Sequence, residues 1–267
     1  MMKLLRISAL MVLAISLVAP MAAYGQDATS VDEIVNKTNT VAYYQGKDGR
    51  AQVKMTIEDQ QGNKREREFV ILRRNADDKN EEQQFYVYFK NPADVREMVF
   101  MVWKHVGKDD DRWMYIPALD VVRQIASSDK RTSFVGSTFF YEDVSGRSLL
   151  EDDHELVETT DNYYVLKNTP KNPGSVEFDS YTMHIHKTSF IPVKVEYEKG
   201  GKVYRTMESL KVENIDGFQT VTQSKIKDTN LGTETTLDYQ KVEYNRDIPE
   251  NIFSERFMRR APRQYLD

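Results

Sequence analysis

Apolar and polar residues alternate with a period of two through much of the chain, which is the pattern of a β-strand with one buried face. Val53, Met55 and Ile57 lie on one side of such a strand, and the polar residues between them lie on the other. A turn-forming stretch follows at residues 59–63, and a second strand-like stretch returns through residues 64–74. The pattern therefore predicts a β-hairpin with its apolar side facing the interior.

Two later stretches predict strands that are more deeply buried than the first hairpin. Residues 83–90 place Phe85, Val87 and Phe89 on one face and tyrosines on the other. Residues 98–103 are apolar at every position, which is typical of a strand that is buried on both faces. This favours a sheet that encloses another part of the chain.

The second half of the chain continues with short strands separated by turns. The predicted strands are residues 154–160, 163–168, 178–186, 193–198, 203–210, 220–228 and 233–244. Strands and turns at this spacing are typical of an antiparallel barrel or sandwich. No long linker rich in Pro, Gly and Ser divides residues 26–267, so we expect a single domain there.

A helix is predicted before the sheet. Ser30 suits an N-cap, and Glu33 three residues later completes a capping box. The apolar or small residues at helical spacing are Val31, Ile34, Val35, Thr38 and Val41. We expect one amphipathic helix that ends near residue 44 and packs against the sheet, with membrane binding as the alternative.

Residues 109–143 pass from an acidic stretch to apolar, strand-like stretches, then to a polar turn and an aromatic stretch. Three acids at 109–111 are expected to form a solvated turn, and residues 113–116 then form a short strand that Pro117 closes. Residues 121–125 form the returning strand. Trp113, Tyr115 and Pro117 are therefore expected to be structural, with cargo binding as the alternative.

Residues 133–141, which we call the covering segment, show no clean periodicity. Phe134, Phe139 and Phe140 surround Gly136, and this suits a segment laid over a sheet better than a strand within it. Gly136 offers a hinge because glycine has free backbone dihedrals, the phenylalanines offer an apolar underside, and Glu142 and Asp143 offer a wet rim. We expect a movable lid, and a fixed cap is the alternative.

The N-terminus has the pattern of an export signal. Lys3 and Arg6 precede an apolar run at residues 7–19, and small residues follow, which predicts a signal peptide over residues 1–25. An uncleaved anchor is the alternative. Without Lys3 and Arg6 the chain has 35 basic and 42 acidic residues, a net charge of about −7, so no nucleic-acid footprint is present. Because the chain has no cysteine, the exported protein lacks disulfides and a lipid-bearing cysteine.

Patterns that would indicate catalysis or metal binding are weak. His184 and His186 share one strand face, but only His105 and His154 remain to complete a zinc site, and the acids at 109–111 lack the spaced oxygen ligands of a calcium loop. The sequence contains neither a nucleophile elbow nor a phosphate-binding glycine loop. We therefore expect no enzyme, no metal site and no cofactor.

The runs WMYIPALDVVRQIA and FVGSTFFYEDV, together with FYVYFKNPADVREMVFMVWKH upstream, give a family resemblance. They resemble the LolA-like outer-membrane lipoprotein-sorting proteins of the LolA/LolB/RseB superfamily. The resemblance implies a mainly β fold with short helices, an open, curved antiparallel half-barrel covered on its concave face, and a hydrophobic cavity without a catalytic centre. It also implies a periplasmic location and an RND/MMPL-type transporter in the inner membrane as a partner.

With this resemblance, we expect a carrier or chaperone that binds a lipidated protein or a lipid and moves it to an outer-membrane acceptor. A sensor or protein-interaction module similar to RseB is the alternative. The candidate cavity residues are Val53, Met55, Ile57, Phe85, Val87, Phe89, Met101, Trp103, Phe134, Phe139 and Phe140. A plain β core would use the same residue types. The arginine that gates the cavity in LolA is matched to no single one of Arg50, Arg65, Arg67, Arg73 and Arg123.

Overall fold

A computed structural model describes residues 29–77 and 82–267, and the predicted signal peptide lies outside these residues. In the described residues, thirteen antiparallel strands form one sheet in the order β6-β5-β4-β3-β2-β1-β13-β12-β11-β10-β9-β8-β7. The strands of the first half are β1 Asp48–Glu58, β2 Lys64–Asn75, β3 Gln83–Asn91, β4 Val99–Lys104, β5 Asp111–Ile116 and β6 Val121–Ile125. Those of the second half are β7 Asp152–Thr159, β8 Tyr163–Pro170, β9 Ser180–His186, β10 Pro192–Lys199, β11 Lys202–Ile215, β12 Phe218–Asp228 and β13 Thr233–Tyr244.

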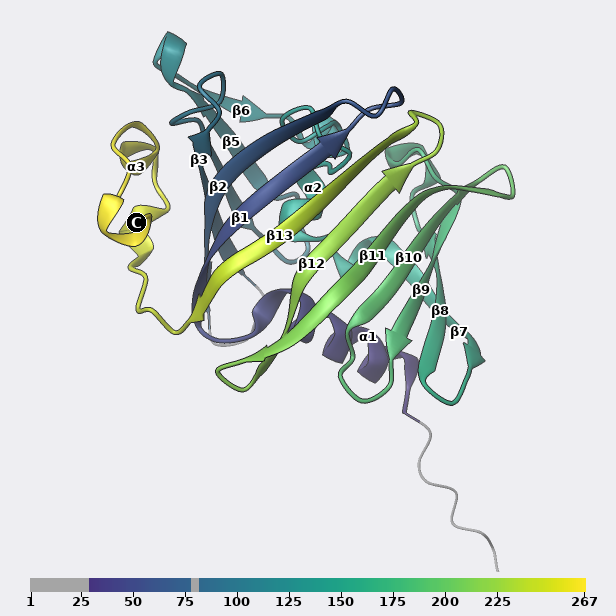
Figure 1. The fold of residues 1–267 in the computed structure, drawn as a ribbon. Helices are drawn as coiled ribbons and strands as arrows, with labels where there is room; N and C mark the ends of the chain where they lie inside the picture. The colour runs from purple at the N-terminus through teal and green to yellow at the C-terminus, as the bar shows by residue number, and fades with distance from the viewer. Residues whose placement is uncertain (1–28, 78–81) are drawn as a thin grey trace, which may run out of the picture.

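The chain enters the sheet in its middle at β1, runs outward to the edge strand β6, and then returns from the opposite edge strand β7 inward to β13. Strands that follow one another in sequence are paired, except β6 and β7, and β13 closes the sheet by pairing with β1. The register slips at several places, for example between Ser209 and Lys211 in β11, and such bulges bend and twist a strand. The result is an open, strongly curved sheet, as expected, whose two edges are β6 and β7 (Figure 1).

The predicted N-terminal helix is confirmed. Helix α1 spans Val31–Asn39 and continues as a π-helical turn, η1, over Thr40–Tyr44. The Ser30 hydroxyl accepts a hydrogen bond from the backbone N–H of Glu33 at 3.1 Å, as an N-cap should. The apolar side of α1 packs on β8 and β9, where Ile34 is fully buried, and η1 then carries the chain across the hollow side of the sheet.

The covering segment lies on the concave face and forms no strand with the sheet. The Phe134 ring lies 5.8 Å from the ring of Phe89 and 5.3 Å from that of Phe100, centroid to centroid. The short helix α2, Tyr141–Ser145, follows inside the curve of the sheet (Figure 1). One hydrophobic core therefore lies between the sheet and residues 133–145.

The convex face carries a second core that the sequence did not predict. After β13 the chain forms the short helices η6 Glu250–Ile252, α3 Glu255–Arg259 and η7 Arg263–Tyr265, which pack over β2–β5. This C-terminal segment covers β4 on the convex side and accounts for the burial of β4 on both faces. Among the described helices, none is long and apolar enough to cross a membrane.

Met101 and Trp103 belong to this convex side, so their prediction as cavity residues is wrong. Met101 is buried in the convex core, and the Trp103 indole N–H donates to the carbonyl of Phe253 at 3.0 Å. Phe100 and Val102 face the concave side instead. Because residues 98–103 are all apolar, the period-two pattern could not tell one face from the other. Trp113 packs edge to face on Trp103 in the same convex core, in keeping with a structural role.

Candidate functional site

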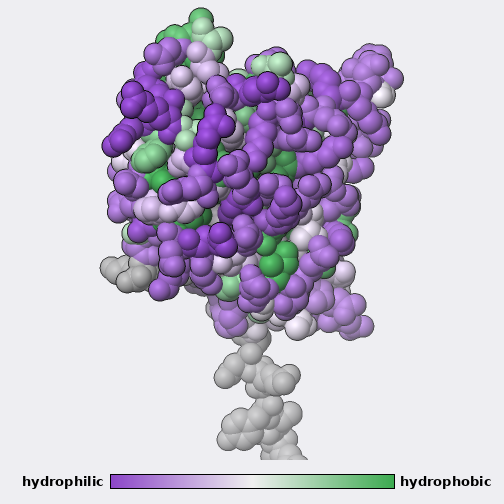
Figure 2. Space-filling view, turned by 60° about the vertical axis from the view of Figure 1, so that its left-hand side comes forward, coloured by the Kyte–Doolittle hydropathy of each residue, from purple (hydrophilic) through white to green (hydrophobic). Residues whose placement is uncertain are grey.

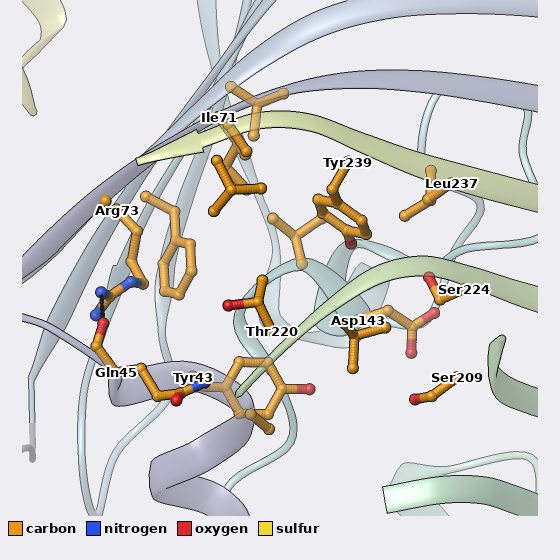
Figure 3. A pocket seen from close by; sticks show the side chains of 18 of the residues that line it. Tyr43, Gln45, Ile71, Arg73, Asp143, Ser209, Thr220, Ser224, Leu237 and Tyr239 are labelled. Carbon is orange, nitrogen blue, oxygen red and sulfur yellow. Dashed lines mark hydrogen bonds between the residues drawn. The ribbon is translucent and has the colours of Figure 1, made fainter. Parts of the chain in front are cut away.

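An apolar cavity lies on the concave face between the sheet, η1 and the covering segment, as Figure 3 shows. Its volume is about 320 Å³, within the range of small-molecule sites, and a second cavity of about 180 Å³ shares part of its lining. The main apolar lining residues are Val41, Ala42, Tyr43, Met55, Phe69, Ile71, Phe85, Val87, Phe134, Phe139, Met207, Leu237 and Tyr239. This lining brings together segments from both halves of the chain.

Five of the predicted candidates line this cavity, namely Met55, Phe85, Val87, Phe134 and Phe139. Val53, Ile57 and Phe89 share their face and their buried cluster, but they are packed against other side chains rather than along the empty space. The period of two therefore selects the correct face of β1 and β3. It cannot say where along each strand the empty space lies.

Phe140 does not line either cavity, which corrects its prediction as a cavity residue. Its ring packs against two guanidinium groups, 4.9 Å from that of Arg131 and 4.3 Å from that of Arg205. A guanidinium group is attracted to the face of an aromatic ring, so these cation–π contacts stabilise the Phe140 ring next to the two arginines. The side chain thus belongs to a charged cluster below the covering segment.

Glu142 and Asp143 do not form a wet rim, and that prediction is wrong. The Glu142 side chain is only 3% exposed and forms ion pairs with Arg131 at 2.6 Å, Lys130 at 3.3 Å and Arg147 at 3.4 Å. Asp143 forms a buried ion pair with Arg205 and also lines the cavity. Helix α2 therefore rests on a buried ionic cluster.

Arg205 is the most buried member of this cluster and was not among the predicted candidates. Its side chain is fully buried, it donates to Asp143 and to the Thr138 carbonyl, and it lies on the same strand as cavity-lining Met207. The period of two in β11 places residues 205 and 207 on one face, and this was the available sequence signal. Asp143 lies 62 positions away, and that pairing carries no local signature.

The predicted solvated turn at residues 109–111 is also wrong for its central residue. The Asp110 side chain is 10% exposed, accepts a 2.6 Å hydrogen bond from Arg112 and accepts another from the Ser145 hydroxyl at 3.2 Å. It thereby ties β5 to the end of α2. His184 and His186 have separate partners, and no group of three or more metal-ligating side chains occurs in residues 29–77 and 82–267.

One end of the cavity is polar because Arg73 projects into it from β2 (Figure 3). Its guanidinium donates to the carbonyls of Gln45 and Gly46 and, at 2.6 Å, to the side-chain oxygen of Asn75. Burial lowers the pKa of Arg73 to about 10, so the side chain is still charged at neutral pH. Asp143 lies on the other side of the same cavity, with apolar side chains between the two.

Tyr43 of η1 fills the boundary between the two cavities. Burial raises the pKa of its hydroxyl, so the group stays neutral. Its ring packs against Gly146, where φ is 78° and an added Cβ would lie only 2.5 Å from the ring. Gly146 therefore allows η1 to approach α2 closely.

The covering segment is attached to the sheet mainly through side chains. The Arg67 Nε donates to the carbonyl of Val135 at 3.1 Å, and the Thr235 hydroxyl accepts from the backbone N–H of Thr138 at 2.9 Å. The hydroxyls of Thr138 and Thr235 are also 3.0 Å apart. A segment held by such contacts can separate from the sheet without breaking a β-ladder.

The outer surface shown in Figure 2 is mostly hydrophilic, with a group of apolar side chains at the top. The turn between β5 and β6 lies at this height, and Leu119 and Val121 there are 68% and 45% exposed. Single exposed apolar side chains are common on soluble proteins. We therefore assign the candidate site to the cavity on the concave face.

Comparisons with known proteins identify relatives of this fold. A family model described as "Uncharacterized protein" matches residues 81–260, and no curated protein matches the sequence. A DUF1329 family protein from Desulfovibrio piger is 24% identical, with a TM-score of 0.77 over 86% of this chain and 100% of that chain. A domain assigned as an outer membrane lipoprotein-sorting protein from Vibrio parahaemolyticus is 22% identical, with a TM-score of 0.76 over 85% of this chain and 97% of that chain. A LolA superfamily protein from Nitrosomonas europaea is 19% identical, with a TM-score of 0.65 over 86% of this chain and 100% of that chain.

Proposed function

We propose that the protein is a periplasmic carrier of the LolA-like type that binds acyl chains in its concave cavity. The chain belongs to the family whose model, described as "Uncharacterized protein", matches residues 81–260, and its fold is similar to those of a lipoprotein-sorting domain and a LolA superfamily protein. The cargo is a lipidated protein or a lipid. It is loaded at the inner membrane, with an RND/MMPL-type transporter as donor, and passed to an outer-membrane acceptor. The protein performs no catalysis in this role.

The observation that supports this proposal best is the apolar cavity of about 320 Å³ between the sheet and the covering segment. A protein that needed only stability would fill such a space, because interiors pack as densely as organic crystals and each void costs stability. Met55 and Met207 contribute flexible side chains to the wall, and methionine adapts to ligands of irregular shape. The space is therefore better explained as a binding site than as a packing defect.

The energetics of the cargo explain why a carrier needs a cover. Each buried methylene gains about 0.8 kcal/mol, so one sixteen-carbon chain has roughly 12 kcal/mol of gross transfer free energy that opposes its crossing of an aqueous compartment. A carrier must offset most of this cost and still release the chain. A cover that opens provides both properties, because it shields the chain in transit and exposes it at the acceptor.

A disulfide between the covering segment and the sheet is expected to stop exchange of cargo. Thr138 and Thr235 are suited to it because their hydroxyls lie 3.0 Å apart and the chain has no cysteine of its own. Oxidation of the Thr138→Cys/Thr235→Cys variant should slow the uptake of a fluorescent fatty acid at least about tenfold, and reduction should restore it. Stopped-flow fluorescence measures both rates.

A second pair of cysteines provides the matched control. Thr56 and Thr236 are partners on β1 and β13, so a disulfide there joins two strands of the wall and leaves the covering segment free. The oxidised control should take up the fatty acid at the wild-type rate. Equal rates in the oxidised and reduced forms of the Thr138/Thr235 variant would mean that the covering segment is a fixed cap and that cargo enters elsewhere.

A further inference from the structure

Arg73 differs from the other lysine and arginine side chains that line the two cavities. Within the described part of the chain, Arg50 pairs with Glu243 at 3.3 Å, Arg147 with Asp152 at 2.8 Å and Lys225 with Glu234 at 3.0 Å. Arg73 has no carboxylate partner in residues 29–77 and 82–267. Its acceptors are the two backbone carbonyls of residues 45 and 46 and a side-chain amide oxygen, all of them neutral.

The guanidinium of this cavity-lining residue has donors to spare. It makes three hydrogen bonds within the described residues, whereas a guanidinium has five N–H groups in a planar fork. Two donors therefore remain for a ligand. The cavity wall next to Arg73 is otherwise apolar, since Ile71 precedes it on the same face of β2 and Phe85 lies opposite it on β3.

A half-buried cation outside any ion pair is unfavourable because burial penalises its charged form, and burial lowers the pKa of Arg73 although Tyr244, Asp48 and Tyr44 nearby offset part of this effect. An acid group placed beside it would regain the lost solvation through charge-assisted hydrogen bonds. The planar fork matches the oxygens of a carboxylate or a phosphate, which it can hold in a bidentate manner. A neutral ligand of the same length would gain none of this.

We propose that Arg73 is the headgroup subsite of the cavity, and that the preferred ligand is an amphiphile whose acid group, a carboxylate or phosphate, binds Arg73 while its acyl chain extends over Ile71 and Val87 towards Phe134. This inference rests on the proposed function and adds the chemical class of the ligand and its orientation. The other side of the cavity offers an acid group no comparable site, because the cation there, Arg205, is already paired with Asp143.

The test compares a sixteen-carbon fatty acid with its methyl ester, each displacing a neutral fluorescent probe at pH 8 from the wild type and from Arg73→Gln. The wild type should bind the acid about 10- to 100-fold more tightly than the ester, the range expected for charge-assisted hydrogen bonds to one guanidinium. Arg73→Gln should bind the two ligands equally and keep its affinity for the ester. Arg74→Gln is the matched control, because Arg74 is the next residue on β2, lies on the opposite face and should leave the preference unchanged.

Three outcomes would overturn the proposal. The first is equal binding of acid and ester by the wild type, and the second is a preference for the acid over the ester that survives in Arg73→Gln. The third is displacement of the bound acid by millimolar inorganic phosphate, which would show that the subsite binds free anions. Should Arg73→Gln fail to fold, Arg73→Lys keeps the charge and removes the fork, and its preference must then fall below that of the wild type. Failure of the wild type to bind either ligand would instead contradict the proposed function itself.

Discussion

Val87→Asp is expected to abolish acyl-chain binding. Val87 is fully buried in the concave core and lines the cavity from β3, so we expect a chain bound there to contact it. A carboxylate without a partner in an apolar site costs several kcal/mol if it stays charged, and otherwise its pKa rises and it takes up a proton. Fluorescence titration with a fatty-acid probe should show affinity reduced at least about 100-fold.

Because this variant also stresses the core, its fold is checked by circular dichroism before binding is measured. A second variant, Ile71→Trp, fills the cavity with apolar volume; Ile71 borders empty space, so the indole should enter without overpacking. Val203→Asp is the control, since Val203 is 42% exposed and its substitution should leave binding unchanged. Wild-type affinity in folded Val87→Asp and in Ile71→Trp would place the ligand outside this cavity.

The largest effect on stability is expected from Glu142→Gln. This carboxylate pairs with three cations, Lys130, Arg131 and Arg147, in a place that water hardly reaches, and each of these cations has a second carboxylate partner in Glu151, Glu177 or Asp152. The variant therefore loses three buried ion pairs but leaves no cation unpaired, so we expect a cost of about 3 kcal/mol, the lower end for a broken buried pair. The melting temperature should fall by roughly 10 °C, which calorimetry measures. Glu151→Gln, whose side chain is 32% exposed, should cost only about 1 kcal/mol.

The effect of Glu142→Gln should also depend on pH. Burial alone would raise the pKa of Glu142, but Arg131, Arg147 and Lys130 outweigh it and hold the pKa below the ordinary value of 4.5. The stabilisation is therefore complete above the pKa of the unfolded chain and is lost as the pH falls through the lower pKa of the folded protein. The difference between wild type and variant should shrink below about pH 4.5, and a constant difference at every pH would show that Glu142 acts through its shape instead.

The sheet could be predicted from the sequence because period two is a local property. β1, β2 and β3 alternate clearly, and each appears where the pattern placed it. The predicted strand at residues 203–210 continues to Ile215, because the bulges in β11 interrupt the alternation without ending the ladder. The C-terminal helices were missed because elements of three to five residues are too short to show a helical period.

The site was harder to predict because its key contacts join distant parts of the chain. Glu142 and Asp143 look like solvated acids next to an aromatic run, and only the fold brings Arg205 beside Asp143. Arg73 follows the apolar run of β2 as an ordinary charged residue would, and its place in the cavity depends on the route of η1. Sequence alone therefore identifies the wall of the cavity but not the charges at its ends.

The central claim, that the cavity carries acyl chains, is tested most directly by native mass spectrometry of the mature protein purified from cells without detergent. The account predicts that the wild type carries bound molecules, and that these, after release and fragmentation, are identified as lipids or acyl chains with an acid group. It also predicts that Val87→Asp carries none of them. A wild-type protein that carries no lipid, that takes none up after incubation with vesicles, and that binds a protein partner tightly would contradict the carrier and favour a sensor.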